Sequence, residues 1–384
     1  MKVAVLGYGT VGAGVYSMLS DAPGMEAGPV LVRPGKAVES FMVSDAALIF
    51  GDPTVDAVVE TLGRLDPAYS YGMRALKAGK HFITANKAMV AAHGLELAAL
   101  AREKGAAFLF SAACGGGVPF LHNLALSAET DRIEAVSGIL NGTTNYMLDA
   151  MQRRSLSYGD ALRKAQSLGY AESDPTADVS GLDALRKMQL ACAVAFGVLP
   201  QSGMLCEGME HFTAADVEDI QSRGLVCRLM ARGSRAGESV SAYVEPVLFP
   251  RAAPESSVFT NNNMARYTGK RCGSIVLMGQ GAGRFPTASA VLRDLSAAQQ
   301  GARSMFPENC RAAEPDNREA VHSYYIRTGG FAAVRLSLRS VLAQGEVVRA
   351  VTEPMSAEKM HALAQNIRKD GNDLFFAALE EELC

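Results

Sequence analysis

Short apolar runs alternate with stretches of helical periodicity through the N-terminal third of the chain. The apolar runs predict buried strands at residues 2–6, 30–32, 56–62, 80–84 and 108–110, and helices are predicted between them at 10–19, 64–78 and 95–104. Strands that alternate with helices indicate right-handed crossovers and a parallel sheet. The pattern therefore predicts an α/β domain over residues 1–130.

The pattern changes after residue 130. Strands and helices mix less regularly between residues 131 and 287, which predicts an α+β domain, and a helix at about 288–302 is expected to complete the first domain. Residues 307–316 are rich in Pro, Asn and charge, which is typical of a linker. The tail, residues 318–384, predicts a small module with strands at 323–327, 347–352 and 374–379 and helices at 331–342 and 357–369.

Three glycines follow the first predicted strand with the spacing G-x-G-x-x-G: Gly7, Gly9 and Gly12. Glycine at these positions permits a tight turn, close approach of the backbone to a pyrophosphate and close packing of the next helix. Thr10 and Val11 lie in the same turn. Placed between a strand and a helix, the motif predicts a dinucleotide site in a Rossmann-type domain. A tight turn without a ligand is the alternative interpretation.

Basic residues follow the second predicted strand. Arg33 and Lys36 occupy the region where an NAD-preferring site usually places an acid on the ribose. A cation there favours the 2′-phosphate of NADP, so the sequence predicts a preference for NADP over NAD. A solvated basic turn is the alternative.

Polar residues and a glycine follow the next strands. Ligands of a parallel sheet lie beyond the carboxyl ends of its strands, and Thr61, Gly63, Asn86 and Lys87 fall there. We therefore expect these residues to lie near the cofactor. Because Asn is common in turns, Asn86 and Lys87 are also compatible with a plain turn.

Asp183 and Lys187 lie four residues apart in LDALRKMQLACAVAF, whose second half is apolar nearly all round. The spacing places both side chains on one face of a helix that is predicted to be buried. An exposed ion pair is the commonest reason for such spacing, but a lysine that leads into a buried helix is typical of a functional amine. Lys187 is therefore the candidate proton donor and acceptor for an alcohol and aldehyde interconverted on a nicotinamide.

Further acids, amides and hydroxyls surround this pair in the sequence. Glu172 and Asp178, together with the aspartate of the pair, would bind the ammonium group of a zwitterionic substrate, and Asn141, Thr143, Thr144 and loop amides would bind its carboxylate. A solvated loop that caps helices is the alternative for the acids. The sequence thus predicts a site for a small charged amino acid.

Composition narrows the classes of function. A chain of 384 residues exceeds the size at which one core keeps growing, so two or three domains are expected. A net charge of −3 without a long basic run gives no footprint for nucleic acid or an anionic membrane. The apolar stretch at residues 190–199 is too short to span a bilayer, and the opening run is too short for a secretory signal. Seven scattered cysteines are typical of reduced thiols in a cytoplasm.

Seven segments of the chain together resemble homoserine dehydrogenases. In the family's order they are GYGTVGAGV, DAVVETLG, ALKAGKHFITANKA, GGGVP, GILNGTTNYML, GYAESDPTADVSGLDALRK and GQGAGRFPTASAVLRDL. The resemblance implies reversible NAD(P)-dependent interconversion of L-aspartate 4-semialdehyde and L-homoserine, in threonine, methionine and isoleucine synthesis. It also implies that Lys187 is the proton donor, that Glu172 and Asp183 bind the substrate and that Lys87 contacts the cofactor.

The resemblance assigns further parts of the site and the assembly. Gly169, Gly281 and Gly283 are expected to line the site. The domain at residues 131–287 is expected to bind the substrate and to supply a dimer interface, so a cytoplasmic homo-oligomer, a dimer or a tetramer, is predicted. Another semialdehyde-linked dehydrogenase and a nucleotide-binding protein without activity are the alternatives.

The chain departs from the family's pattern in two places that bear on binding and regulation. Ser111 stands where the family usually has a glutamate before the glycine loop. The family's monovalent cation would then depend on the backbone carbonyls of Cys114, Gly116 and Val118. The tail begins with SYYIR, similar to the opening of a regulatory ACT domain, without the D-x-P-G turn that usually follows. We expect an ACT-like C-terminal module at residues 318–384.

Overall fold

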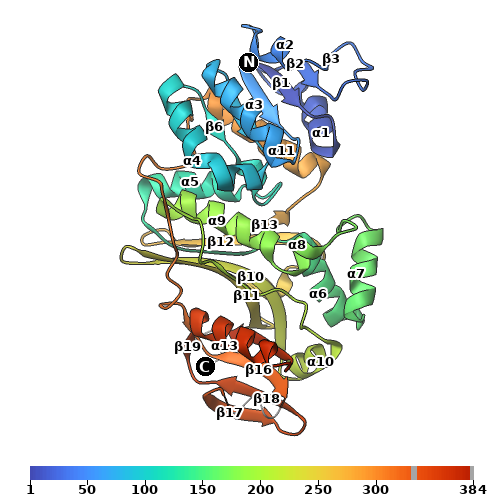
Figure 1. The fold of residues 1–384 in the computed structure, drawn as a ribbon, viewed down its shortest axis with the longest axis vertical. Coiled ribbons are helices and arrows are strands. Elements are labelled where there is room, and N and C mark those ends of the chain that lie inside the picture. Colours follow the sequence, from blue (N-terminus) through green and yellow to red (C-terminus); the bar gives the residue numbers. More distant parts are fainter. Residues whose placement is uncertain (330–334, 381–384) are drawn as a thin grey trace.

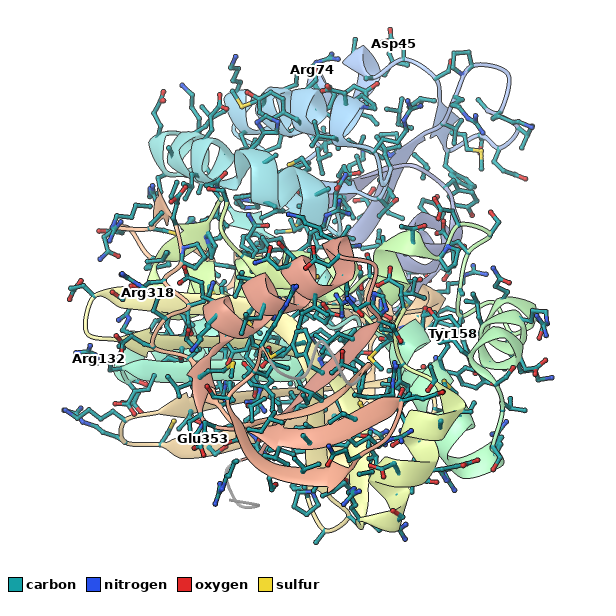
Figure 2. All side chains as sticks on the ribbon, turned by 60° about the horizontal axis from the view of Figure 1, so that its bottom comes forward. Asp45, Arg74, Arg132, Tyr158, Arg318 and Glu353 are labelled. Atoms are coloured by element: carbon teal, nitrogen blue, oxygen red, sulfur yellow. The ribbon has the colours of Figure 1, made fainter. Side chains whose placement is uncertain are left out.

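The computed structural model of the chain describes residues 1–329 and 335–380. Two main sheets follow one another along the long axis, and the helices of the first domain lie above those of the second (Figure 1). Exposed charged side chains such as Asp45, Arg74, Arg132 and Arg318 project from the periphery (Figure 2). The two domains therefore meet across a helical layer in the middle of the molecule.

The first sheet has six parallel strands in the order β3-β2-β1-β4-β5-β6. Their bounds are Lys2–Leu6 (β1), Glu26–Leu31 (β2), Met42–Val43 (β3), Ala57–Glu60 (β4), His81–Thr84 (β5) and Phe108–Leu109 (β6). Central strands of such a sheet are covered on both faces, which explains why β4 is buried along its whole length. The strand order reverses between β1 and β4, and ligands bind at such a switch point. The predicted Rossmann-type sheet is confirmed.

Helices cover both faces of this sheet. They are α1 (Thr10–Leu19), α2 (Ala47–Phe50), α3 (Leu65–Lys77), α4 (Lys87–Lys104) and the later α11 (Arg284–Gln299). The prediction that the fourth began near residue 95 is wrong, because Asn86 accepts a hydrogen bond from the Met89 amide at 3.1 Å and caps α4 at Lys87. Helix α11 lies beside α1 (Figure 1), where Gly14 leaves room for Arg284.

The second sheet is mixed and has ten strands, in the order β13-β12-β7-β10-β11-β20-β16-β18-β17, with β9 beside β11. Their bounds are Ile133–Ile139 (β7), Leu205–Cys206 (β9), Leu225–Ala236 (β10), Ser239–Pro250 (β11), Asn262–Gly269 (β12), Gly273–Gln280 (β13), Tyr324–Gly329 (β16), Leu338–Ala343 (β17), Val347–Thr352 (β18) and Leu374–Leu379 (β20). Strand β20 pairs with β11 through Val247↔Ala378 and Leu248↔Leu379. The C-terminal module therefore extends the sheet of the second domain.

The helices of this half pack on the same sheet or border it. They are α5 (Phe120–Thr130), α6 (Gly142–Arg154), α7 (Tyr158–Ser167), α8 (Thr176–Val179), α9 (Leu182–Phe196), α10 (Ala214–Ser222) and α13 (Ala357–Lys369), with 3-10 turns η1 (Ser111–Ala113) and η2 (Pro254–Ser257). Two small ladders join β8 (Val198–Pro200) to β14 (Arg311–Ala313) and β15 (Val321–His322) to β19 (Met355–Ser356).

Two predictions for the C-terminal part need correction. Residues 307–316 are not purely a linker, because β14 within them pairs with β8. A helix is predicted at 331–342, but residues 331–334 lie outside the described residues. Over the rest of this range the prediction is wrong, because β17 begins at Leu338 and pairs antiparallel with β18. Cross-strand pairing satisfies the backbone there, which a local pattern does not reveal. The predicted helix at 357–369 and the strands at 347–352 and 374–379 are confirmed.

Two further observations concern the described part of the chain. None of its helices has the length and apolarity needed to cross a membrane. Its six cysteines are free thiols, and Cys384 lies outside the described residues.

Candidate functional site

A cavity of about 1130 Å³, the cofactor cavity, lies beyond the carboxyl ends of the central strands of the first sheet. Five residues predicted to bind the cofactor line it: Gly7, Gly9, Arg33, Lys36 and Thr61. Its walls also carry Arg64 and three aromatic side chains, Tyr8, Phe41 and Tyr71. The cavity thus combines a glycine turn, a basic rim and apolar faces, which suits a dinucleotide.

The glycine turn requires its glycines. Gly7 has φ +99°, a region that other residues rarely adopt. A Cβ on Gly12 would lie 2.1 Å from the Gly7 carbonyl oxygen, so α1 packs directly against the turn. The Thr61 hydroxyl donates to the Leu6 carbonyl at 3.0 Å and ties the turn to the end of β4. Thr10 begins α1 behind the turn.

A second cavity of about 750 Å³, the substrate cavity, lies between the two domains. Its lining includes these residues of the predicted site: Val11, Lys87, Gly116, Asn141, Thr143, Gly169, Glu172, Asp178, Asp183, Lys187, Gly281 and Gly283. Because Val11 lines this cavity while Gly7 and Gly9 line the other, both cavities border the glycine turn. A nicotinamide nucleotide that lies in the first cavity can therefore reach into the second.

The Lys187 amine lies inside the substrate cavity, with 12% of its side-chain surface exposed. It contacts the Asp183 Oδ2 atom at 2.7 Å and donates to the Leu140 carbonyl at 2.6 Å. Burial alone would lower the pKa of Lys187, but the Asp183 carboxylate outweighs burial and raises the pKa above its ordinary value. The contact with Asp183 therefore favours the ammonium form of Lys187.

Asp183 is the centre of a charged cluster. The Lys87 amine lies 3.1 Å from its Oδ1 atom, and the Asn141 amide donates to its Oδ2 atom at 2.9 Å. Burial would raise the pKa of Asp183, but the charges of Lys187 and Lys87 lower it below its usual range. Lys87, which the sequence placed among the cofactor ligands, thus contacts the acid that pairs with Lys187.

Asn141 holds the two aspartates of the site together. Its amide also donates to Asp178 Oδ1 at 2.7 Å, and its carbonyl oxygen accepts from the Thr144 amide at 2.8 Å, which caps α6. The Thr143 hydroxyl donates to the Tyr170 carbonyl at 2.5 Å. Burial raises the pKa of Asp178, and the nearby Asp183 charge adds to the effect. The Asn141 amide and the Thr143 hydroxyl therefore already donate hydrogen bonds to protein groups. The sequence alone does not reveal these hydrogen bonds.

The remaining predicted residues lie around the two cavities. Glu172 borders the substrate cavity, and within the described residues its carboxylate makes no hydrogen bond or ion pair. The Asn86 side chain is used structurally, because it caps α4 and donates to the Arg64 carbonyl at 2.9 Å. Neither Asn86 nor Gly63 lines either cavity among the described residues.

The glycine loop offers a cation only backbone oxygens. The Ser111 hydroxyl donates to Asp294 Oδ1 at 2.5 Å, and the Ser111 amide donates to Asp294 Oδ2 at 2.8 Å. Burial raises the pKa of Asp294 to about 7. The part of the chain that the structure describes has no cluster of three His, Cys, Asp or Glu side chains that could hold a metal ion. A cation here would depend on the carbonyls of Cys114, Gly116 and Val118 alone.

Several lining residues were missed by sequence reasoning. Arg186 lies three residues after Asp183, so the helical spacing could have indicated it. Arg64 directly follows Gly63, just beyond the carboxyl end of β4. Asn261 precedes β12 and Gln280 ends β13, at the open end of one hairpin. The pairing of β12 with the distant β7 positions this hairpin in the sheet, which local sequence patterns do not reveal.

Comparisons with known proteins identify the family of the chain. The family model of the homoserine dehydrogenase NAD-binding domain matches residues 7–111, and the homoserine dehydrogenase model matches residues 119–296. The chain is 36% identical over 313 residues to homoserine dehydrogenase of Lactococcus lactis subsp. lactis, covering 77% of this chain and 73% of that protein. It is 38% identical over 314 residues to that of Corynebacterium glutamicum, with 76% and 70% covered.

A solved structure gives the same result over the full length. The crystal structure of a homoserine dehydrogenase from Thiobacillus denitrificans matches with a TM-score of 0.88 and 29% identity, covering 99% of this chain and 98% of that one. The family models, the curated relatives and the fold confirm the resemblance that the sequence motifs indicated. The chain belongs to the homoserine dehydrogenase family.

Proposed function

We propose that Lys187 is the proton donor and acceptor in the NAD(P)-dependent interconversion of L-aspartate 4-semialdehyde and L-homoserine. The observation that supports this role is the position of its amine, buried beside Asp183 in a cavity that adjoins the glycine turn. Burial of a charged amine costs free energy. Buried ionisable groups with shifted pKa values cluster at functional sites.

When bound, the nicotinamide supplies or accepts a hydride at the substrate carbon. During reduction, the Lys187 ammonium donates a proton to the aldehyde oxygen, and during oxidation the neutral amine accepts the proton of the hydroxyl group. Asp183 and the Leu140 carbonyl hold the amine in place. The Lys187 and Asp183 side chains are only 12% and 13% exposed, and shielding from water strengthens the interaction between their charges.

The acids that line the substrate cavity are proposed to bind the substrate ammonium. Asp178 and Glu172 face this cavity, and Asn141 fixes Asp178 relative to Asp183. Because the Asn141 and Thr143 donors are already used, loop amides and the exposed Arg186 are left for the substrate carboxylate. Selectivity for an amino acid would come from the negative acids that bind its ammonium group and from the positive Arg186 that binds its carboxylate.

We also propose that NADP is preferred over NAD. Arg33, Lys36 and Arg64 all line the cofactor cavity, where a cation can bind the 2′-phosphate. The ratio of kcat/KM for the two nucleotides tests this preference.

Other predictions from the sequence remain proposals. Titration with Na⁺ or K⁺ tests the backbone cation site at Cys114, Gly116 and Val118. Light scattering tests the predicted dimer or tetramer. Fractionation of the source cells tests the predicted cytoplasmic location.

The direct test follows the absorbance of NADPH during homoserine oxidation by the wild type and by Lys187→Ala. The variant is expected to lose turnover and to keep its affinity for NADPH, because the amine lies in the substrate cavity and not in the cofactor cavity. Normal turnover in the variant would overturn the assigned role. Tight NADPH binding without turnover by the wild type would favour a nucleotide-binding protein instead.

A further inference from the structure

The C-terminal module holds a segment of the second domain that reaches toward the substrate cavity. This segment, the strap, consists of residues 205–213 and begins with β9. Arg368 of α13 donates from both Nη atoms to the Glu207 carboxylate, at 2.9 and 2.7 Å. The Glu207 side chain is 9% exposed and that of Arg368 21% exposed. A bidentate contact that is largely shielded from water fixes the orientation of both groups.

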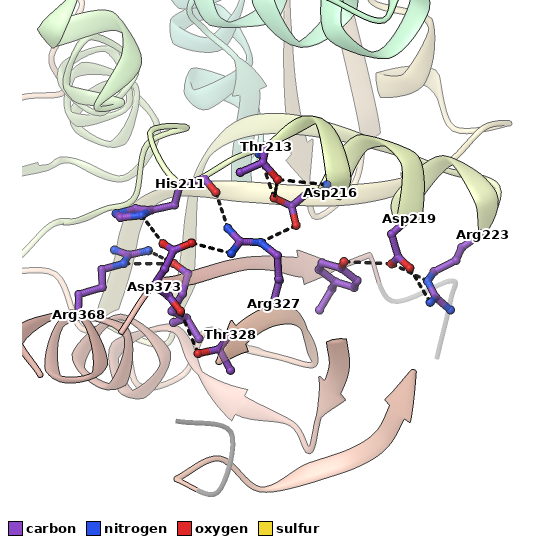
Figure 3. Close-up of polar contacts among 11 residues, drawn as sticks. His211, Thr213, Asp216, Asp219, Arg223, Arg327, Thr328, Arg368 and Asp373 are labelled. Carbon is purple, nitrogen blue, oxygen red and sulfur yellow. Dashed lines mark hydrogen bonds and ion pairs between the residues drawn. The ribbon is translucent and has the colours of Figure 1, made fainter. Parts of the chain in front are cut away.

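A second arginine of the module holds the far end of the strap. Arg327 of β16 donates to the His211 carbonyl at 2.8 Å, to Asp216 Oδ1 at 2.8 Å and to Asp373 Oδ2 at 2.6 Å (Figure 3). The other oxygen of Asp373 contacts the His211 ring at 2.9 Å. The module therefore anchors the strap at two points.

The middle of the strap lies directly against the turn that precedes α9. The Met209 amide donates to the Val179 carbonyl at 2.9 Å, and the Cys206 thiol donates to the Ser180 carbonyl at 3.1 Å. A Cβ on Gly208 would lie 2.2 Å from the Val179 oxygen and 2.6 Å from Ser180 Cα. The two backbones are in contact without spare room, so a shift of the strap shifts the turn.

That turn sets the position of the acids in the substrate cavity. Asp178 lies in α8, just before it, and Asp183 lies in the first turn of α9, just after it. Gly181 between them has φ +83°, and a Cβ there would approach the Cys206 Sγ atom at 3.1 Å. The strap therefore packs against the segment that joins the two aspartates.

We infer that Arg368 is a positioning residue for the reaction, which acts through Glu207 and the strap on the spacing of Asp178 and Asp183. This inference rests on the proposed role of these acids in binding the substrate ammonium. A misplacement of about 1 Å in such a site can lower the rate by as much as about 100-fold. None of the strap residues lines the cofactor cavity within the described residues. We therefore expect loss of Arg368 to weaken binding of the amino acid and to leave binding of the nucleotide unchanged.

The first experiment compares Arg368→Ala with Arg335→Ala, whose side chain makes an exposed ion pair with Asp370 in the same module. We expect Arg368→Ala to raise the KM for homoserine by about tenfold or more, with the NADPH dissociation constant unchanged and with partial rescue by added guanidinium. Arg335→Ala should behave as the wild type. A folded Arg368→Ala protein with the wild-type KM for homoserine would overturn the inference, as would equal losses of homoserine and NADPH binding.

A second variant tests the other end of the connection if Arg368→Ala does not fold. Gly208→Ala pushes against the turn directly and is expected to raise the KM for homoserine selectively. The control is Gly159→Ala in α7, where the nearest atom to an added Cβ is the end of the flexible Arg163 side chain at 3.4 Å. A wild-type KM in Gly208→Ala would overturn the inference.

Hydrogen exchange separates this inference from the proposed function. The amides of residues 178–183 should lose protection in Arg368→Ala even in a protein without turnover. Unchanged protection of these amides in Arg368→Ala would overturn the role of the strap and leave the proposed reaction untouched. Loss of protection in Arg368→Ala, together with a wild-type protein that does not oxidise homoserine, would support the strap and overturn the proposed reaction.

Discussion

Replacement of Asp183 by Asn removes the negative charge that Lys187 and Lys87 contact. The Lys187 contact, at 2.7 Å, is shielded from water, whereas the Lys87 side chain is 33% exposed. Opposite charges about 4 Å apart interact by about 4 kcal/mol at an effective dielectric constant of about 20, and removal of one partner of a buried pair typically destabilises a protein by about 3–5 kcal/mol. The Lys87 contact is screened and adds less than about 1 kcal/mol. Because Lys187 can release its proton in the variant, we expect the free energy of unfolding to fall by about 3 kcal/mol.

The same substitution should change how activity depends on pH. Asp183 raises the pKa of Lys187 against the effect of burial, so its loss lowers that pKa. The ammonium that donates the proton then disappears at a lower pH, and the basic limb of kcat/KM for semialdehyde reduction should move to lower pH. General acid catalysis is worth about 100-fold or more, so reduction should be slower by at least that factor where the amine is neutral.

Two measurements decide this prediction. Urea unfolding gives the change in stability, and steady-state reduction of the semialdehyde over a pH series gives the profile. An Asp183→Asn protein with a basic limb at the wild-type pH and a stability within about 1 kcal/mol of wild type would refute the coupling of the two charges.

Four further substitutions test the cofactor cavity and the glycine loop. Gly12→Ala places a Cβ 2.1 Å from the Gly7 oxygen and should abolish NADPH binding, which fluorescence titration measures. Arg33→Ala and Lys36→Ala should each weaken NADPH by about tenfold, because each removes a charge-assisted contact, and leave NADH unchanged; equal losses for both nucleotides would contradict the preference. Burial raises the pKa of Asp294 from 3.8 to about 7, so the folded state favours its protonated form. The stability that the protonated carboxyl contributes is fully present below pH 3.8 and is lost as the pH rises through about 7, a loss of about 4 kcal/mol. In Asp294→Asn, urea unfolding should show no such dependence of the free energy of unfolding on pH.

The parts that the sequence predicted correctly are local. The spacing of Gly7, Gly9 and Gly12 indicates a turn between a strand and a helix, and the spacing of Asp183 and Lys187 indicates one face of α9. Both follow from the periodicity of the backbone.

The parts that the sequence did not predict depend on contacts between distant segments. The 3.1 Å contact of Lys87 with Asp183 joins the start of α4 to α9 across the domain boundary. The use of the Asn141 amide between two aspartates requires a folded loop. Strand β17 depends on its pairing with β18, and the strap depends on Arg368, far along the chain. Local patterns carry no information about such pairs.

The role of Lys187 depends on the position of its amine relative to the reacting atoms. A crystal structure of the protein with an oxidised nicotinamide nucleotide and L-homoserine measures this position directly. We predict that the substrate hydroxyl lies within hydrogen-bond distance of Lys187 Nζ, at about 3 Å, and that the carbon bearing this hydroxyl faces the nicotinamide. A hydroxyl group that lies beyond reach of that amine, or contacts a different proton donor, would contradict it.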